Sequence, residues 1–225
     1  MSDLDRRLRR DGLTLGGFAL AGFAADYLLN VVLSRLLDAH AFGDYRVASS
    51  FATLLAIVVA LGGERLAPKV LSTHFAGGHA AEVWEYLRFF LRSILGLSAI
   101  VIVGTWTLAV WSVGPSVDQH HALIWLVAAV PLVAAGELFS KALLAAGHPT
   151  RAAAPWRLGF PLALVGAVAI LQWAGGSVSL HEALGATIAV LLALGTVQWL
   201  QLRRLALPRL QRAISFRTPR SWLAV

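Results

Sequence analysis

The chain has 225 residues, of which 58% are hydrophobic and only 14% are charged. A soluble domain of this size carries about 25% charged residues, so the composition excludes an ordinary soluble fold and indicates an integral membrane protein. The net charge of +7 comes from basic clusters between apolar stretches, which argues against nucleic-acid binding. Because the chain has no cysteine, disulfides, thiolate metal sites and cysteine nucleophiles are excluded as well.

The first forty residues fit two interpretations. Four arginines precede an apolar run, as in a signal peptide, and Ala39-His40-Ala41 has the small-x-small pattern of a cleavage site. However, the run over 13–37 is longer than a signal-peptide core of about 7–15 residues, and it contains Asp26 and Arg35. We therefore expect an uncleaved first transmembrane helix behind a cytoplasmic arginine cluster.

Apolar runs of about 20 residues are long enough to cross the hydrocarbon layer of a membrane. In lipid every backbone polar group needs an internal partner, so such runs are predicted to be helices. The predicted spans are 13–36, 44–67, 87–113, 121–146, 156–174 and 181–202, followed by a basic tail over 203–225. The predicted fold class is therefore an all-α integral membrane protein, with a single domain over 1–225 that forms a bundle of six transmembrane helices.

Basic residues alternate between the connections of this bundle. The connections at 38–43, 114–120 and 175–180 contain no Lys or Arg, whereas the N-terminal segment, the tail and the connections at about 68–92 and 147–157 are basic. Loops rich in Lys and Arg stay on the cytoplasmic side. We expect both termini in the cytoplasm.

Polar residues inside the spans are the best candidates for function. Charged side chains in a membrane are costly and usually face a bundle interior or a water-filled cavity. At 100° per residue, one face of the second predicted span carries Arg46, Ser49, Ser50, Thr53 and Glu64. This pattern predicts a polar stripe along an otherwise apolar helix.

The first and fourth spans carry further polar pairs. Asp26 and Asn30 share a face of the first span, while Glu137 and Lys141 are four residues apart in the fourth and can pair. We expect a hydrated cavity lined by the first, second and fourth spans. The alternative is structural, with pairing of Glu137 and Lys141, and with side chains that reach the membrane surface at Arg35, Arg46 and Lys69.

No catalytic centre is predicted, and the protein is not expected to be an enzyme. The chain has no P-loop, no GxSxG, no Rossmann fingerprint and no HExxH pattern. Asp118, His120 and His121 fall in a predicted outer loop, where a solvated loop is expected rather than a metal site. No cofactor and no metal are expected.

The corner over 33–45 resembles the start of oligosaccharide flippases of the polysaccharide transporter family, in the multidrug/oligosaccharidyl-lipid/polysaccharide (MOP) exporter superfamily. In that family an Arg-Leu-Leu-Gly type sequence ends helix one, a Phe-Gly-x-Tyr turn follows, and helix two ends in Leu-Gly. Here Arg35 begins the first motif, 42–45 reads Phe-Gly-Asp-Tyr, and Leu61-Gly62 ends the second run. A second similar region runs over 141–164. Asp38 and His148 depart from the Gly and Arg that are common at their positions.

The resemblance implies a bundle like the N-lobe of a MATE/MOP-type flippase, which is one of the two six-helix halves that family members usually have. The chain would then be a fragment, a truncated product, or a half that forms a homodimer or joins a second six-helix half; truncation is the preferred interpretation. The implied location is a bacterial-type plasma (inner) membrane.

The implied function is flipping of lipid-linked oligosaccharide or polysaccharide precursors, such as those of lipopolysaccharide, across that membrane by alternating access. The expected partners are membrane lipid and the lipid-linked glycan. The candidate substrate-binding residues are Arg46, Arg35, Lys141, Ser50 and Thr53, and the candidates for ion coupling are Asp26, Glu64 and Glu137. Two alternatives stay open: a non-transporting scaffold subunit of a glycan-assembly complex, and an inactive truncated flippase. A membrane-embedded transferase is disfavoured because no paired-carboxylate or His-Asp centre is found.

Overall fold

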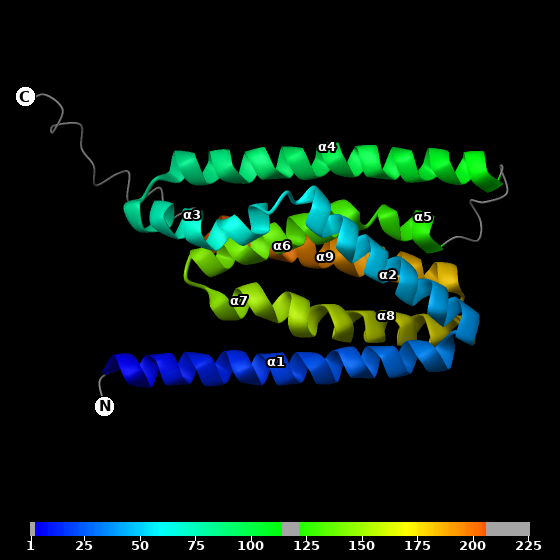
Figure 1. Cartoon of the computed structure of the whole chain (residues 1–225). Helices are drawn as coiled ribbons and strands as arrows, with labels where there is room; N and C mark the ends of the chain where they lie inside the picture. Colours follow the sequence, from blue (N-terminus) through cyan, green and yellow to red (C-terminus); the bar gives the residue numbers. More distant parts are fainter. Residues whose placement is uncertain (1–2, 114–121, 206–225) are drawn as a thin grey trace, which may run out of the picture.

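The computed structural model of the protein describes residues 3–113 and 122–205, and the regular elements within these ranges are helices. Six stretches are long and apolar enough to cross a membrane, which confirms the predicted number of spans. The long helices run along one common direction, and α1 begins at the end of the bundle where α9 ends (Figure 1). The predicted connection at 114–120 and the tail from 206 onward lie outside the described residues.

Helix α1 (Asp3–Leu36) ends where the sequence predicts, and α2 (Ala39–Val59) begins almost at once. Asp38 is the N-cap residue of α2, because its carboxylate accepts a hydrogen bond of 2.8 Å from the backbone N–H of Ala41. The polar corner predicted over 38–43 is therefore mostly the first turn of a helix.

The second predicted span is wrong at its C-terminal end. Instead of one helix over 44–67, α2 ends at Val59 and α3 (Gly63–Gly77) begins after a sharp break. The break has positive φ angles at Leu61 (50°) and Gly62 (73°), a left-handed conformation that glycine adopts without steric cost. Residues 68–77, predicted to be part of a connection, are helical.

The third and fourth spans are α4 (Ala80–Val113) and the pair α5 (Ala122–Val127) and α6 (Val130–Ala145). Helix α4 starts seven residues before the predicted 87, so the connection predicted over 68–92 shrinks to a short turn near His79. The fourth span is interrupted just before Pro131, which lies in the first turn of α6, where its missing N–H costs nothing.

The fifth span is longer than predicted and changes its helical form. It consists of α7 (Pro149–Ala154), the π-helical segment η2 (Pro155–Gly159) and α8 (Phe160–Gly175), and it starts seven residues before the predicted 156. Pro155 cannot donate a backbone hydrogen bond, and the N–H of Phe160 donates to the carbonyl of Pro155 in the wider π register. The sixth span is α9 (Leu180–Leu205).

Helix α6 forms the centre of the bundle, in contact with α2, α3, α4, α7 and α9. Helix α1 instead packs on η2 and α8, and it hardly contacts α2. Gly22 permits this packing, because a Cβ there would lie 3.1 Å from the carbonyl oxygen of Arg157. Helices α1 and α8 therefore lie on one side of α6, with α4 on the other (Figure 1). The separation of α1 from α2 leaves room for a groove between them.

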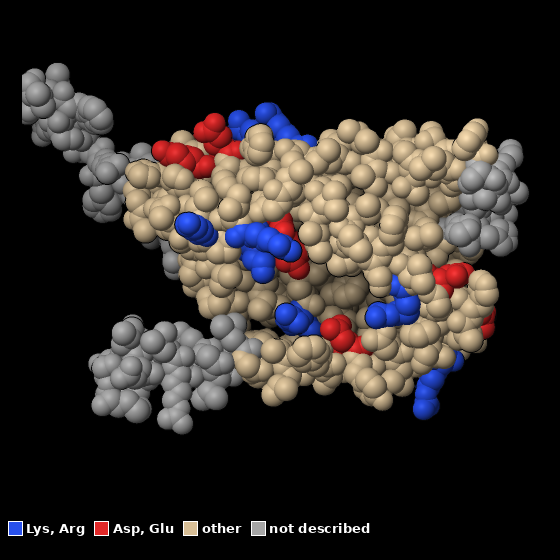
Figure 2. Space-filling view, in the orientation of Figure 1, with Lys and Arg blue, Asp and Glu red and all other residues tan. Residues whose placement is uncertain are grey.

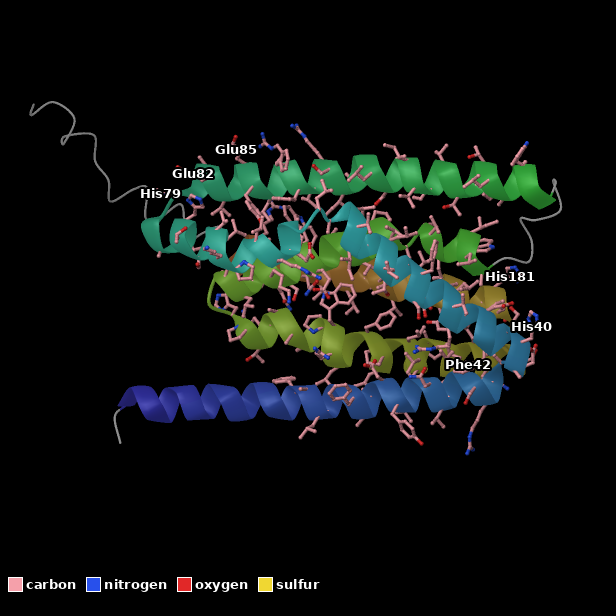
Figure 3. The ribbon with its side chains drawn as sticks, viewed as in Figure 1. His40, Phe42, His79, Glu82, Glu85 and His181 are labelled. Carbon is pink, nitrogen blue, oxygen red and sulfur yellow. The ribbon has the colours of Figure 1, made fainter. Side chains whose placement is uncertain are left out.

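The connections between the helices lie at the two ends of the bundle. His40 and His181 lie at one end of the bundle (Figure 3). His40 is within the connection at 38–43 and His181 directly follows the one at 175–180, and neither connection contains Lys or Arg. His79, Glu82 and Glu85 lie at the opposite end, near the turn between α3 and α4 (Figure 3). The connections at 38–43 and 175–180 thus lie at the opposite end of the bundle from the turn between α3 and α4.

Candidate functional site

A groove of about 360 Å³ lies between α1 and α2, and its inner wall comes from α5, α6, η2, α8 and α9. Figure 2 shows a hollow on the face viewed, with both basic and acidic side chains around it. The polar residues that line the groove are Asp26, Asn30, Tyr45, Arg46, Ser49, Thr53, Glu137, Trp156 and Thr187.

The groove lies where the sequence places a cavity, between the first, second and fourth spans. Of the eight candidate site residues, the structure brings four together in its lining: Asp26 from α1, Arg46 and Thr53 from α2, and Glu137 from α6. Three spans thus contribute charged side chains to one site. The fifth and sixth spans complete the wall, which the sequence did not predict.

The other four candidates do not line the groove. Arg35 is exposed in the last turn of α1, beyond the groove, and Ser50 points outward one residue after Ser49. Lys141 lies one turn beyond Glu137 along α6 and is half-buried. Glu64 is separated from Arg46 by the break after α2, so the predicted polar stripe ends at Thr53.

Glu64 has a separate environment at the start of α3. Its side chain is nearly enclosed, and Oε1 lies 3.7 Å from Nε of Arg65, whose own side chain is exposed. Its other oxygen, Oε2, is buried and has no hydrogen-bond partner among the described residues. Nearby, the hydroxyl of Tyr86 donates a hydrogen bond of 2.6 Å to the carbonyl of Gly63. Glu64 is therefore a buried carboxylate outside the groove.

The charges of the groove do not neutralise one another through direct contact. Among the described residues, contacts between acidic and basic side chains join His40 to Asp44 and Glu64 to Arg65, and none joins Asp26, Arg46 or Glu137 to another side chain. The alternative in which Glu137 pairs with Lys141 is not seen among the described residues, where no ion pair joins them. One guanidinium and two carboxylates are thus available to a ligand.

The hydroxyl groups on α2 are already oriented by their own helix. The hydroxyl of Ser49 donates to the carbonyl of Arg46 at 3.0 Å, and that of Thr53 donates to the carbonyl of Ser49 at 2.9 Å. On α1, the side-chain amide of Asn30 donates to the carbonyl of Asp26 at 2.8 Å. Because the hydrogen of each hydroxyl is already donated to a backbone carbonyl, the hydroxyl oxygen can act only as an acceptor for O–H or N–H groups of a ligand.

The inner wall of the groove is partly aromatic and is held by buried hydrogen bonds. The indole N–H of Trp156 donates to Oε1 of the fully buried Gln198 at 2.8 Å. Gly136 packs against the Trp156 ring so closely that an added Cβ would overlap it. The hydroxyls of Tyr45 and Thr187 lie 3.0 Å apart and share a hydrogen bond. Phe160 also lines the groove.

Sequence reasoning missed Trp156, Phe160 and Thr187 as lining residues. They belong to the fifth and sixth spans, which the sequence did not place at the cavity. The packing of α9 on α6, and of α8 on α9 and η2, brings them to the groove. The one signal in the sequence was Tyr45, which ends the Phe-Gly-x-Tyr pattern and lines the groove in contact with Thr187.

The described residues hold no group of three or more His, Asp or Glu side chains that could bind a metal ion. Asp118, His120 and His121 lie outside those residues. The groove itself combines one cation, two anions, hydroxyl acceptors and aromatic surface, which suits the binding of a polar ligand within the membrane. No protein-family model matches the chain, and no match is found among curated proteins or solved structures.

Proposed function

We propose that the chain is half of a membrane transporter that flips a lipid-linked oligosaccharide precursor across a bacterial-type plasma membrane by alternating access. The observation that carries this proposal is the groove, where Asp26, Arg46 and Glu137 from three membrane-spanning segments meet without direct ion pairing. Ionisable residues in such segments are retained for function, because charge in lipid is otherwise costly. The family resemblance of the corner over 33–45 supports the choice of substrate.

The proposed ligand has an anionic part and a hydroxyl-rich part, and the groove offers chemistry for both. The Arg46 guanidinium presents paired N–H donors that match a phosphate group. The hydroxyl oxygens of Ser49 and Thr53 and the two carboxylates accept hydrogen bonds from sugar hydroxyls. The second N–H of the Asn30 amide donates to a sugar oxygen. The aliphatic chain of the lipid stays in the surrounding hydrocarbon.

Asp26 and Glu137 are proposed to couple transport to an ion. The groove thus has two acidic side chains and one basic side chain, Arg46. An anionic head group adds negative charge, so its entry is favoured when a proton or a cation enters with it. Release on the other side of the membrane then frees both. In this scheme the positive-inside pattern places both termini in the cytoplasm.

The first prediction concerns Arg46. In proteoliposomes that contain a fluorescent isoprenoid-pyrophosphate-linked oligosaccharide, Arg46→Ala is expected to slow flipping by at least about ten-fold, because loss of one charged hydrogen-bond partner costs about 2–5 kcal/mol. Arg46→Lys keeps the charge and is expected to retain part of the rate. The matched control, Arg92→Ala, removes an exposed arginine of α4 outside the groove and is expected to leave the rate unchanged.

Equal rates for Arg46→Ala and wild type, at equal amounts of folded protein, would exclude Arg46 as a head-group contact. If the wild-type protein does not flip the glycolipid but co-purifies with glycan-assembly enzymes, the scaffold alternative gains over transport.

A further inference from the structure

A second hollow lies along the first turns of α4, on the other side of α6 from α1. Its volume is about 910 Å³, and the described residues that line it all belong to α4. Its charged side chains are Glu85, Arg88 and Arg92, and its aromatic side chains are Trp84 and Phe89. These five residues define the α4 hollow. None of the described residues of α4 lines the groove between α1 and α2, so the two sites are separate.

The α4 hollow lies at the membrane surface. With 34 residues, α4 is about 51 Å long at about 1.5 Å per residue, whereas a bilayer with its head groups is about 40–45 Å thick. Along the helix from Ala80, Glu85 is at about 8 Å, Arg88 at about 12 Å and Arg92 at about 18 Å. The carboxylate of the hollow is therefore nearer to water than its guanidinium groups. This order holds whichever end of the bundle faces the cytoplasm.

The charged groups of the α4 hollow are not paired with one another. Glu85 and Arg88 are three residues apart, a spacing that allows an ion pair on a helix. In the part of the chain that the structure describes, however, no contact between acidic and basic side chains involves Glu85, Arg88 or Arg92, and all three are exposed. Glu82 and Glu85 lie near the start of α4 (Figure 3), and basic side chains follow the acidic ones along this edge (Figure 2). One carboxylate and two guanidinium groups are thus available to a ligand, at different depths.

The same face of α4 is apolar beyond the arginines. At 100° per residue, Leu95, Val103 and Trp106 lie on the face that carries Arg88 and Arg92. These apolar side chains are all exposed, Leu95 by 62%. The face therefore presents charge at the membrane surface and apolar side chains towards the middle of the bilayer, which matches the head group and the acyl chains of a phospholipid.

We propose that the α4 hollow binds a phospholipid whose head group ends in a primary ammonium, phosphatidylethanolamine. In a bilayer the phosphate of this lipid lies at the edge of the hydrocarbon, and the ammonium lies nearer to water. Arg88 and Arg92 donate charge-assisted hydrogen bonds to the phosphate, and the carboxylate of Glu85 accepts hydrogen bonds from the ammonium. The indole of Trp84 lines the same end of the hollow as Glu85, and aromatic rings attract cations.

Glu85 is the residue that decides between lipid classes. A head group without an ammonium, such as that of phosphatidylglycerol, matches the two arginines but brings an anion next to the carboxylate. A choline head group is positive, but its trimethylated nitrogen has no N–H to donate. A primary ammonium has both the charge and three N–H donors, as in the lysine side chain. The order of charges along α4 therefore favours phosphatidylethanolamine.

Native mass spectrometry of the purified full chain measures this preference. The protein in detergent is mixed with equal amounts of phosphatidylethanolamine, phosphatidylglycerol and phosphatidylcholine, and the bound lipids are quantified. The wild type is expected to bind phosphatidylethanolamine at least about three-fold more than either other lipid. The expected factor is modest because the contacts are exposed to water.

Two substitutions separate the two ends of the head group. Glu85→Gln is expected to bring the preference for phosphatidylethanolamine over phosphatidylglycerol close to one, because a neutral amide does not attract the ammonium. Arg88→Ala is expected to lower the binding of all three lipids at least about three-fold, because each has a phosphate. The matched control, Glu82→Gln, removes an exposed carboxylate of α4 that does not line the hollow and is expected to keep the wild-type preference.

Equal binding of the three lipids by the wild type, or a preference for phosphatidylglycerol, would overturn the proposal. So would an unchanged preference in Glu85→Gln, or an equal loss of preference in Glu82→Gln. Since the groove and the α4 hollow are separate, loss of this lipid is expected to leave flipping unchanged. A lipid preference in a chain that does not flip the glycolipid therefore leaves the lipid site in place and removes the transport assignment; flipping without the preference has the reverse meaning.

Discussion

At the scale of single residues, the groove depends on side chains that never touch its opening. Gln198 is fully buried in α9, yet its Oε1 accepts the indole N–H of Trp156 and so fixes an aromatic ring in the groove wall. Its amide nitrogen lies 3.5 Å from the carbonyl of Ala152, which also accepts the Ser140 hydroxyl at 2.8 Å. These contacts tie α6 and α9 to the segment around the π-helix.

The amide of Gln198 is expected to contribute measurably to stability. Gln198→Leu leaves the Trp156 N–H without its acceptor and is expected to cost about 1–3 kcal/mol of unfolding free energy. Gln201→Leu, three residues later in α9, is the matched control. Its Oε1 is buried without a hydrogen-bond partner in the described part of the chain, so its removal is expected to be neutral or slightly stabilising. Unfolding of both variants in detergent, followed by tryptophan fluorescence, measures the difference; equal costs would contradict it.

The candidate residues show which side chains of the groove can be predicted from the sequence alone. Asp26, Asn30, Arg46 and Thr53 were predicted from helical angles near the first corner, where the predicted and observed helices agree in register. Glu64 was predicted to share a helical face with Arg46, but the helix breaks between α2 and α3, so the helical angle between these two residues does not apply. Trp156 was missed because an uncharged aromatic residue in a span is usually a packing residue, and only its contact with Gly136 places it at the groove.

At the scale of elements, the break between α2 and α3 is the largest difference from the expected fold. The apolar run is interrupted here, because residues 62–65 read Gly-Gly-Glu-Arg, and the candidate membrane span ends at Val59. The predicted span over 44–67 extended across this signal. Two left-handed residues redirect the chain, and α3 then packs along α6. Because of this turn, α3 packs on the side of α6 away from α1, and α2 lies along the groove.

The glycine at the break is expected to respond oppositely to one inside the helix. Gly62→Ala places a Cβ in a left-handed conformation and is expected to cost about 1–2 kcal/mol of unfolding free energy. Gly43→Ala, in α2 with open space around its Cα, is expected to stabilise by about 0.5–1 kcal/mol. The unfolding free energies of the two variants in SDS titrations are compared with that of the wild type. Equal signs would mean that the break is not held by Gly62.

At the scale of the whole molecule, composition and charge predicted most of the architecture. The number of spans and the end of α1 follow from hydropathy and helix capping, and they are confirmed. The pairing of α1 with α8, and the central place of α6, did not follow. Nearly uniform apolar helices carry little information about which faces meet, because hydrocarbon is as apolar as the helices themselves. At Gly22, the missing side chain permits the close approach of α1 to the backbone of Arg157.

Orientation in the membrane is a property of the whole molecule, and the basic connections predict it. The connections without Lys or Arg, near His40 and before His181, lie at one end of the bundle, and the turn near His79 lies at the other (Figure 3). Each Lys or Arg near the cytoplasmic surface gains about 1 kcal/mol from anionic lipid, so several of them together fix one orientation. The end that carries His40 is therefore predicted to face away from the cytoplasm.

Single cysteines in this cysteine-free chain test that orientation directly. In intact cells a membrane-impermeant maleimide is expected to label His40→Cys, whose position is exposed beside the corner. Ala76→Cys, exposed near the opposite end of α3, is expected to react only after the membrane is opened. The comparison is internal, because both positions are exposed and both variants carry one thiol. Labelling of Ala76→Cys but not His40→Cys in intact cells would invert the bundle, and the groove would then be loaded from the opposite leaflet.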